Sequence, residues 1–240
     1  MIELNNLTRK YGDFTAVSEL NLAVPPGEIF GFIGPNGAGK TTTIKMMGGL
    51  ILPTSGSIKI CGIDMKTHPE EAKRNIGFIP DRPYLYEKLT GMEFMRFIGD
   101  LYLVEEELFL PKTENLLTMF SLIDWADELI ESYSHGMKQR LIMAAALLHD
   151  PKLIIVDEPL VGLDPEGIKM VRGLFRQLTE AGKSIFMSTH TLKVAEDICD
   201  RIGIINRSRL IAIGTIDELR QKAETEEKDL EDVFLKLTRS

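Results

Sequence analysis

Alternating hydrophobic and polar residues mark the start of the chain. The alternation occurs at residues 2–4 and again at residues 20–24, as in strands with one buried face. Turn-forming residues at 11–13 and 25–28 separate these segments from each other and from the apolar run that follows. The pattern predicts a β-rich N-terminal region, in which strands keep one face on the core and one in water.

Short apolar runs and helical spacings alternate through much of the remaining chain. The predicted strands lie at residues 29–33, 57–61, 75–80, 153–156, 184–188, 202–205 and 210–213. The run at 153–156 is typical of a central parallel strand, and the last two runs are spaced as a hairpin. Helical spacing follows at residues 41–50, from Pro165 onward and at residues 192–199. This succession predicts an α/β fold.

The segment from residue 87 to residue 148 has a purely helical pattern. Its last predicted helix, at residues 137–148, is apolar almost all round, so we expect it to be buried between two parts of the molecule. The predicted parts of a single domain of residues 1–240 are a core with the β subdomain at 1–86 and 149–214, a helical subdomain at 87–148 and a helical tail at 215–240. The tail offers a docking face made of Val233, Phe234, Leu235 and Leu237.

Composition and charge exclude some classes of function. The 240 residues are 44% hydrophobic, which is usual for a globular protein. The net charge of −8 argues against non-specific binding to nucleic acid, because no basic excess neutralises phosphates. No apolar run approaches the ~20 residues that cross a bilayer, so we expect a soluble, intracellular protein. Cys61 and Cys199 have no zinc-binding spacing, and we expect both in the core.

The strongest chemical signal is the glycine-rich turn between the strand at 29–33 and the next predicted helix. It satisfies the template G-x-x-x-x-G-K-S/T, in which backbone N–H groups surround an anion at a helix N-terminus. Lys40 can then reach the β- and γ-phosphates of a nucleotide, and the Thr41 hydroxyl can ligate Mg²⁺. The alternative is an ordinary glycine-rich turn. The residues expected to contact the nucleotide are Gly34, Pro35, Asn36, Gly37, Ala38, Gly39, Lys40, Thr41 and Thr42.

Two carboxylates follow the apolar strand at 153–156. Asp157 is placed to hold Mg²⁺, and Glu158 to polarise the water that attacks the γ-phosphate. An Asp-Glu pair in this position is otherwise a helix N-terminus or a loop. A hydrolase needs the second carboxylate, whereas a kinase of nucleoside monophosphates does not.

A second anion-receiving helix start occurs at residues 133–140, where Ser134 and Gly136 open a predicted helix. The chain already has one complete phosphate cradle. A second cradle suggests that two subunits hold a nucleotide between them.

With these motifs, the chain resembles the ATP-binding subunit of an ABC transporter. The resemblance covers nearly all 240 residues, and the motifs occur in the family's order. The resemblance implies a P-loop NTPase (RecA-like) core with an N-terminal antiparallel β subdomain and an inserted α-helical subdomain. It also implies ATP and Mg²⁺ as cofactors. The corresponding segments are the Walker A loop at 34–42, the Walker B strand at 153–158, the signature motif at 134–137, the D-loop at 162–164 with Asp164, the switch histidine His190, and Tyr11 as the aromatic residue that stacks on adenine.

The chain departs from the family pattern at two places. Asp81 stands where the family commonly has Gln; it can ligate Mg²⁺ but cannot donate an amide hydrogen bond. We hypothesise that Asp81 remains a metal or water contact. In the signature motif Tyr133, His135 and Met137 replace the common residues. This form, and the ending at residues 230–235, resemble exporters whose permease is a separate subunit.

The resemblance implies an ATPase subunit that powers transport through a separate integral membrane permease. It implies a homodimer or a pair with a paralogous subunit, located on the cytoplasmic side of the cell membrane as a peripheral protein, with catalysis by Glu158, His190 and Lys40. Residues 82–86, next to Asp81, are the expected permease-docking surface. The alternatives are a soluble ABC-type ATPase acting on ribosomes or DNA, and a regulatory ATP binder that does not hydrolyse. The single cassette and the net charge of −8 disfavour the ATPase that acts on ribosomes or DNA. The presence of Glu158 and His190 disfavours the binder that does not hydrolyse ATP.

Overall fold

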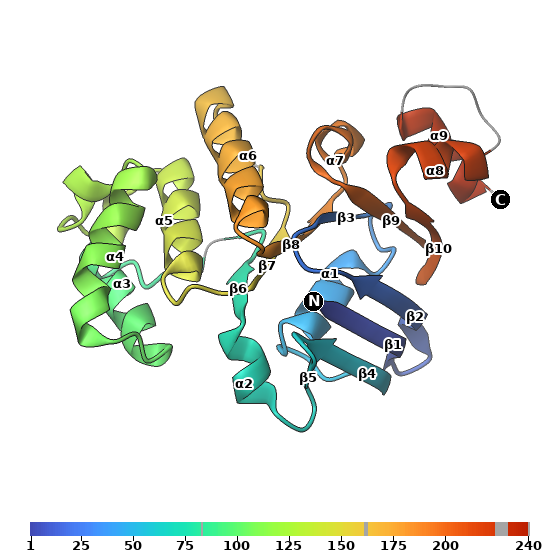
Figure 1. Ribbon diagram of the computed structural model, residues 1–240, viewed down its shortest axis with the longest axis horizontal. Helices are drawn as coiled ribbons and strands as arrows, with labels where there is room; N and C mark the ends of the chain where they lie inside the picture. The colour runs from blue at the N-terminus through green and yellow to red at the C-terminus, as the bar shows by residue number, and fades with distance from the viewer. Residues whose placement is uncertain (83, 161–162, 224–229, 240) are drawn as a thin grey trace.

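A mixed sheet of six strands forms the centre of the molecule. The computed structural model describes residues 1–82, 84–160, 163–223 and 230–239 (Figure 1). The strands are β3 (Ile29–Ile33), β6 (Ile76–Ile79), β7 (Leu153–Asp157), β8 (Ser184–Thr189), β9 (Arg201–Asn206) and β10 (Arg209–Gly214). Their order is β10-β9-β3-β8-β7-β6, and every pair is parallel except the β9–β10 hairpin. The predicted α/β fold with a parallel sheet and this hairpin is confirmed.

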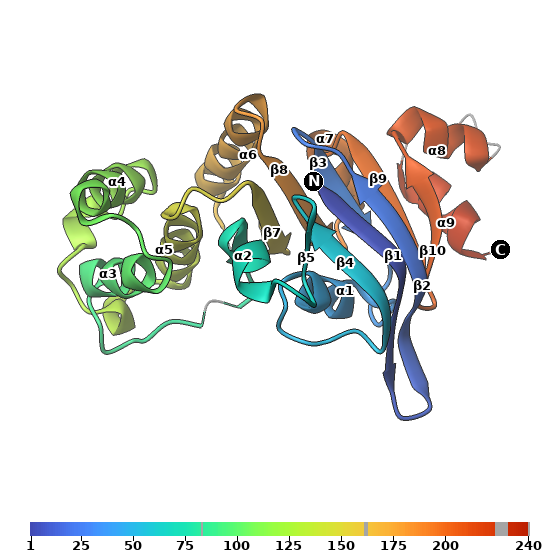
Figure 2. The same ribbon diagram turned by 60° about the horizontal axis from the view of Figure 1, so that its bottom comes forward.

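A second, antiparallel sheet is built from the N-terminal strands. It contains β1 (Ile2–Tyr11), β2 (Phe14–Val24), β4 (Ser55–Ile60) and β5 (Ile63–Asp64), in the order β2-β1-β4-β5. Its buried face shares one hydrophobic cluster with the central sheet, in which Leu4, Leu22 and Ile58 join Phe30 and Phe186. Figure 2 shows the β1–β2 hairpin extending beyond the rest of this sheet. The predicted antiparallel β subdomain is therefore present.

Helix α1 (Lys40–Met47) follows the glycine-rich loop and ends earlier than the predicted residue 50. Gly48 caps the helix, and Gly49 adopts a φ of +66°, in the left-handed region that favours glycine. The N–H of Leu50 then donates to the carbonyl oxygen of Lys45 at 2.9 Å, which closes the last turn. The predicted helix end was wrong because two consecutive glycines terminate the helix before the apolar run does.

The helices at 91–147 gather on one side of the sheet (Figure 1). They are α3 (Gly91–Leu101), α4 (Glu106–Met119) and α5 (His135–Leu147), with the short 3-10 helices η1 (Ile123–Trp125) and η2 (Ile130–Ser132). Helix α5 packs between α3 and α4 on one side and β6 on the other, and six consecutive residues at 141–146 are buried. The expected burial of this helix between two parts of the molecule is confirmed.

The remaining helices flank the central sheet. They are α2 (Pro69–Arg74), α6 (Pro165–Glu180), α7 (Leu192–Ile198), α8 (Ile216–Lys222) and α9 (Leu230–Arg239). The two tail helices α8 and α9 pack on α7 and β10. Of the predicted docking face, Val233 is buried and Phe234 and Leu237 pack against the core, whereas Leu235 points to solvent. Among the residues with described positions, no helix combines the length and apolarity needed to span a membrane.

His149 connects the end of the helical region to the central sheet. Its Nε2 lies 3.0 Å from the carbonyl oxygen of Ile76, and its ring stacks on Tyr102 with the centroids 3.7 Å apart. Burial lowers the pKa of His149 from 6.5 to about 4, because the charged ring would lose its hydration.

We expect the free energy of unfolding to decrease as the pH falls from 6.5 to about 4. In this window the unfolded chain binds a proton at His149 that the folded chain excludes, so acid favours unfolding. Urea denaturation at several pH values measures the slope for the wild type and for His149→Gln, whose side chain does not titrate. The variant should show a weaker dependence on pH, and identical slopes would contradict the assignment.

Candidate functional site

The glycine-rich loop joins β3 to α1, and its back is packed too tightly for side chains. A Cβ on Gly34 would lie 2.3 Å from the carbonyl oxygen of Ile205, and one on Gly39 would lie 2.4 Å from that of Ala16. Gly39 also has a φ of +113°. Both positions therefore require glycine. Pro35, Asn36 and Gly37 are exposed on the other side of the loop, which is open.

Lys40 folds back over this loop from the first turn of α1. Its Nζ donates to the carbonyl oxygens of Gly34, at 2.7 Å, and Pro35, at 3.2 Å. The residue is only 8% exposed, and burial lowers the pKa of its ammonium group, while the charges of Glu158 and Asp157 oppose the shift. The structure thus places one buried cation at the mouth of the loop.

Asp157 is the buried carboxylate beside the start of α1. Its Oδ2 accepts a hydrogen bond from Thr41 Oγ1 at 3.2 Å, and its Oδ1 accepts one from Ser188 Oγ. Burial raises the pKa of Asp157, and the charges of Asp81 and Glu158 raise it further, whereas the two hydroxyl donors lower it. The predicted pair of Thr41 and Asp157 is brought together, although the sequence analysis did not identify Ser188. Its one signal was a hydroxyl residue near the end of an apolar strand.

Glu158 and His190 also lie in contact. Glu158 Oε1 accepts from the backbone N–H of His190 at 2.9 Å and lies 2.6 Å from its Nδ1, and Oε2 accepts from Thr189 Oγ1 at 3.0 Å. Glu158 has a φ of +52°, an unusual conformation for a residue with a side chain. The sequence analysis missed Thr189, which belongs to the same arrangement. The carboxylate is thus oriented by two residues of the neighbouring strand end.

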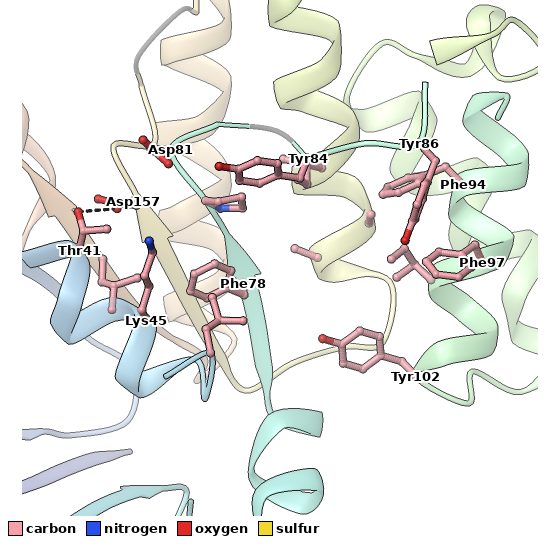
Figure 3. Close-up of a pocket in the computed structure, with 17 residues that line it drawn as sticks. Thr41, Lys45, Phe78, Asp81, Tyr84, Tyr86, Phe94, Phe97, Tyr102 and Asp157 are labelled. Atoms are coloured by element: carbon pink, nitrogen blue, oxygen red, sulfur yellow. Dashed lines mark hydrogen bonds between the residues drawn. The ribbon is translucent and has the colours of Figure 1, made fainter. Parts of the chain in front are cut away.

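A cavity of about 400 Å³ begins at Thr41 and Asp157 and extends toward the helical subdomain (Figure 3). Asp81 lies at its polar end, after β6, and is exposed. Aromatic side chains line the rest of the cavity: Tyr84 lies next to Asp81, and Tyr86 lies with Phe97 at the end formed by the helical subdomain (Figure 3). Asp81 thus stands between the carboxylate site and an apolar groove.

The residues at the polar end fit Mg²⁺ by their chemistry. Thr41, Asp157 and Asp81 offer only oxygen atoms, which Mg²⁺ prefers, and one or two carboxylates suffice when phosphates and water complete the shell. Within the described ranges, no cluster of three or more His, Cys, Asp or Glu side chains forms a closed metal site.

Ser134 and Gly136 are not brought to the phosphate loop. They lie at the start of α5, where Ser134 Oγ accepts from the N–H of Met137 at 3.2 Å. Helices α5 and α1 lie apart in both views (Figures 1 and 2). Tyr133 is buried and donates its hydroxyl to the carbonyl oxygen of Trp125 at 2.5 Å, so it anchors the segment rather than facing a ligand.

Two further predicted residues lie at the periphery. Tyr11 ends β1 and pairs with Phe14 near the tip of the β1–β2 hairpin. The residue is 47% exposed, and the Arg9 guanidinium lies over its ring, 4.5 Å from the centroid. Asp164 caps α6 by accepting from the N–H of Gly167 at 2.9 Å and is exposed. Gly162 of the same predicted motif lies outside the described residues.

The fold and the site together define a P-loop nucleotide-binding protein. The parallel sheet places the phosphate loop, the Asp157–Glu158 pair and His190 at the same edge, which is where ligands bind in such sheets. The chain matches the ABC transporter family over residues 17–161 and belongs to that family. The expected membership and fold are confirmed.

Relatives with known names agree with this assignment. The chain is 38% identical over 240 residues to the probable multidrug ABC transporter ATP-binding protein YbhF of Escherichia coli, covering 99% of this chain and 41% of that protein. It is 38% identical over 219 residues to the linearmycin resistance ATP-binding protein LnrL of Bacillus subtilis, covering 91% and 70%. The chain thus spans less than half the length of YbhF.

Solved structures give the same result. The ATP-binding subunit of an ABC transporter superposes with a TM-score of 0.94 at 34% identity, covering 99% of both chains. A dimeric post-hydrolysis state of an ATP-binding cassette bound to ADP and Pi has a TM-score of 0.82 at 26% identity, covering 90% of this chain and 99% of that one.

Asp81→Ala should raise the Mg²⁺ concentration needed for half-maximal nucleotide binding about threefold to tenfold, the effect of losing one contact worth about 0.7–1.4 kcal/mol. Titration of Mg²⁺ at a fixed nucleotide concentration measures the shift. Asp127→Ala is the control, because Asp127 is an exposed acidic residue that does not line the cavity. Unchanged Mg²⁺ dependence and ATPase activity in Asp81→Ala would refute the metal or water contact.

Proposed function

We propose that this chain is an ATP-hydrolysing subunit that powers transport across a membrane through a separate permease. The observation that carries the proposal is the position of Glu158. Its carboxylate is oriented by Thr189 and His190 next to the pair of Thr41 and Asp157, as a residue that polarises an attacking water must be. The names of the relatives, which include multidrug and linearmycin resistance proteins, favour transport over the alternative on ribosomes or DNA.

The roles follow from the contacts of each group. The loop N–H groups and Lys40 would hold the phosphates, and Thr41 with Asp157 and Asp81 would hold Mg²⁺. When bound, Mg²⁺ would neutralise charge on the β- and γ-phosphates. Glu158 would orient the attacking water, and His190, which lies 2.6 Å from Glu158, would steady the γ-phosphate. Tyr11, which is partly exposed near the tip of the β1–β2 hairpin, would stack on the adenine base.

The site of one chain is incomplete in this proposal. Ser134 and Gly136 lie apart from their own phosphate loop, on a helix start that remains accessible. A second subunit, identical or paralogous, would bring its Ser134 and Gly136 onto the γ-phosphate, with Asp164 near the subunit boundary. The dimeric state of a structural relative bound to ADP and Pi supports this arrangement.

The permease would dock in the groove beyond Asp81 (Figure 3). Tyr84 is 78% exposed and Tyr86 is 60% exposed, which is unusual for aromatic residues lining a cavity. Phe97 packs edge-on against Tyr86 with the centroids 5.3 Å apart. Binding there would place the chain at the cytoplasmic face of the membrane as a peripheral subunit. Pro83, in the same predicted segment, lies outside the described residues.

Glu158→Gln tests the hydrolytic role. The amide keeps the size of the side chain but cannot accept a proton from water, so ATP should bind while turnover falls about 10²-fold or more. Because ATP stays bound, the variant should also accumulate as a dimer. Size-exclusion chromatography in the presence of ATP measures the dimer fraction. A variant that stays monomeric at saturating ATP would count against the sandwich, and one that retains full turnover would count against Glu158 as the catalytic carboxylate.

Tyr84→Ala tests the docking groove. Co-purification of the full-length chain with its permease from detergent-solubilised membranes should fall severalfold, because an exposed aromatic residue anchors interfaces. The melting temperature should not change, since the side chain is largely solvated. Leu52→Ala is the matched control, as Leu52 is 71% exposed and does not line this cavity. Equal co-purification of all three proteins would exclude Tyr84 from the interface.

A further inference from the structure

The turn between β9 and β10 lies behind the phosphate loop and is bound to it through one residue. Ser208 is only 9% exposed, and its three polar groups bond to two segments, the phosphate loop and β2. Its N–H donates to the carbonyl oxygen of Ala38 at 3.1 Å. Its own carbonyl oxygen accepts from the N–H of Ser18 at 2.8 Å, and its Oγ donates to the carbonyl oxygen of Thr15 at 2.6 Å. Ser208 therefore joins the phosphate loop to β2.

The bond to Ala38 sets the orientation of a backbone donor in the loop. In a trans peptide the C=O and N–H groups point in opposite directions, and the described backbone has no cis peptide bond. Because the Ala38 carbonyl points toward Ser208, the N–H of Gly39 points away from it. Ile205 and the β9–β10 turn close the back of the loop, so this N–H is directed to the open side, where an anion would bind.

The bonds to β2 act on the hairpin that carries Tyr11. Thr15 pairs with Lys10, one position from the Tyr11–Phe14 pair. The hairpin extends beyond the neighbouring strand β10 (Figure 2), and a projecting pair of strands has little stability of its own. The hydrogen bond from Ser208 Oγ therefore fixes the hairpin close to Tyr11.

Ser208 makes these bonds from a conformation that favours another residue. Its φ is +70°, in the left-handed region that glycine adopts without steric cost. Glycine could make both backbone bonds there but has no hydroxyl for Thr15. Compared with glycine, serine therefore contributes only its hydroxyl group at this position; the turn itself does not require it.

We propose that Ser208 is a positioning residue. It fixes the β1–β2 hairpin, which carries Tyr11, at the position relative to the phosphate loop where one nucleotide can contact both. The proposal rests on the nucleotide site and the Tyr11 contact proposed above. Loss of the hydroxyl removes the bond to Thr15, close to Tyr11, but leaves the backbone bonds to Ala38 and Ser18. It should therefore weaken the part of nucleotide binding that depends on the base and preserve the part that depends on phosphate.

Isothermal titration of the full chain with ADP and with pyrophosphate, both in Mg²⁺, separates these parts. For Ser208→Ala and Ser208→Gly we expect the Kd for ADP to rise about threefold to tenfold, the effect of one hydrogen bond. The Kd for pyrophosphate should change less than about twofold. Ser208→Gly relieves the backbone conformation, so a folded variant remains if Ser208→Ala is unstable. Unchanged ADP binding, or equal weakening of both ligands, would overturn the proposal.

Two further variants control the experiment. Ser184→Ala removes another buried hydroxyl, which donates to the carbonyl oxygen of Pro25 at 3.1 Å at the far end of β8, and should alter neither Kd. Tyr11→Ala should weaken ADP but not pyrophosphate, and adding Ser208→Ala to it should have no further effect. If Tyr11→Ala leaves ADP binding unchanged, the base contact itself fails. If Tyr11→Ala weakens ADP while both Ser208 variants bind normally, only the role of Ser208 fails.

Discussion

The in-register pairing of β7 with β8 is the constraint on which the site depends. Asp157 lies opposite Ser188 in this ladder, and the N–H of Glu158 donates to the Ser188 carbonyl at 3.0 Å. Two parallel strands end at the same edge, so the register alone brings both carboxylates to the hydroxyl groups at the end of β8 and to the imidazole group of His190 that follows it. A slip of one residue would turn Asp157 to the opposite face of the sheet and away from Thr41. Because β8 also pairs with β3, the same register fixes the distance to the phosphate loop.

Burial shifts the pKa values of Lys40 and Asp157 in opposite directions. The fold tolerates both buried groups because each has fixed hydrogen-bond partners. Burial lowers the pKa of Lys40 and raises the pKa of Asp157, since each charged form loses water. The ammonium donates to two loop carbonyls, and the carboxylate accepts from two hydroxyls. These fixed partners replace water and hold both groups in position. The site is thus preorganised by hydrogen bonds that come from three separate segments.

The sequence predicted those parts of the fold and site that depend on neighbouring residues. Three local patterns identified the strands and the family correctly. They are the apolar run at Ile29–Ile33, the glycines that follow it and the two carboxylates at the end of β7. Ser188 and Thr189 were missed because their partners lie 31 residues away, across a ladder whose register no local pattern specifies. The same holds for Ser208, whose hydroxyl acceptor is 193 residues distant.

The charge balance explains why a nucleotide and a cation would bind together at this site. Lys40 is accompanied by three carboxylates, those of Asp81, Asp157 and Glu158, and a phosphate about 6 Å from one carboxylate is repelled by about 3 kcal/mol at an effective dielectric constant of about 20. A helix dipole can offset part of this repulsion, most fully where the first turn carries no acidic residue of its own. Helices α1, α5 and α7 have no acidic residue in the first turn, whereas α3, α4 and α6 each have one or more there. The starts of α1 and α5, which we propose to bind phosphate, are therefore electrostatically suited to an anion.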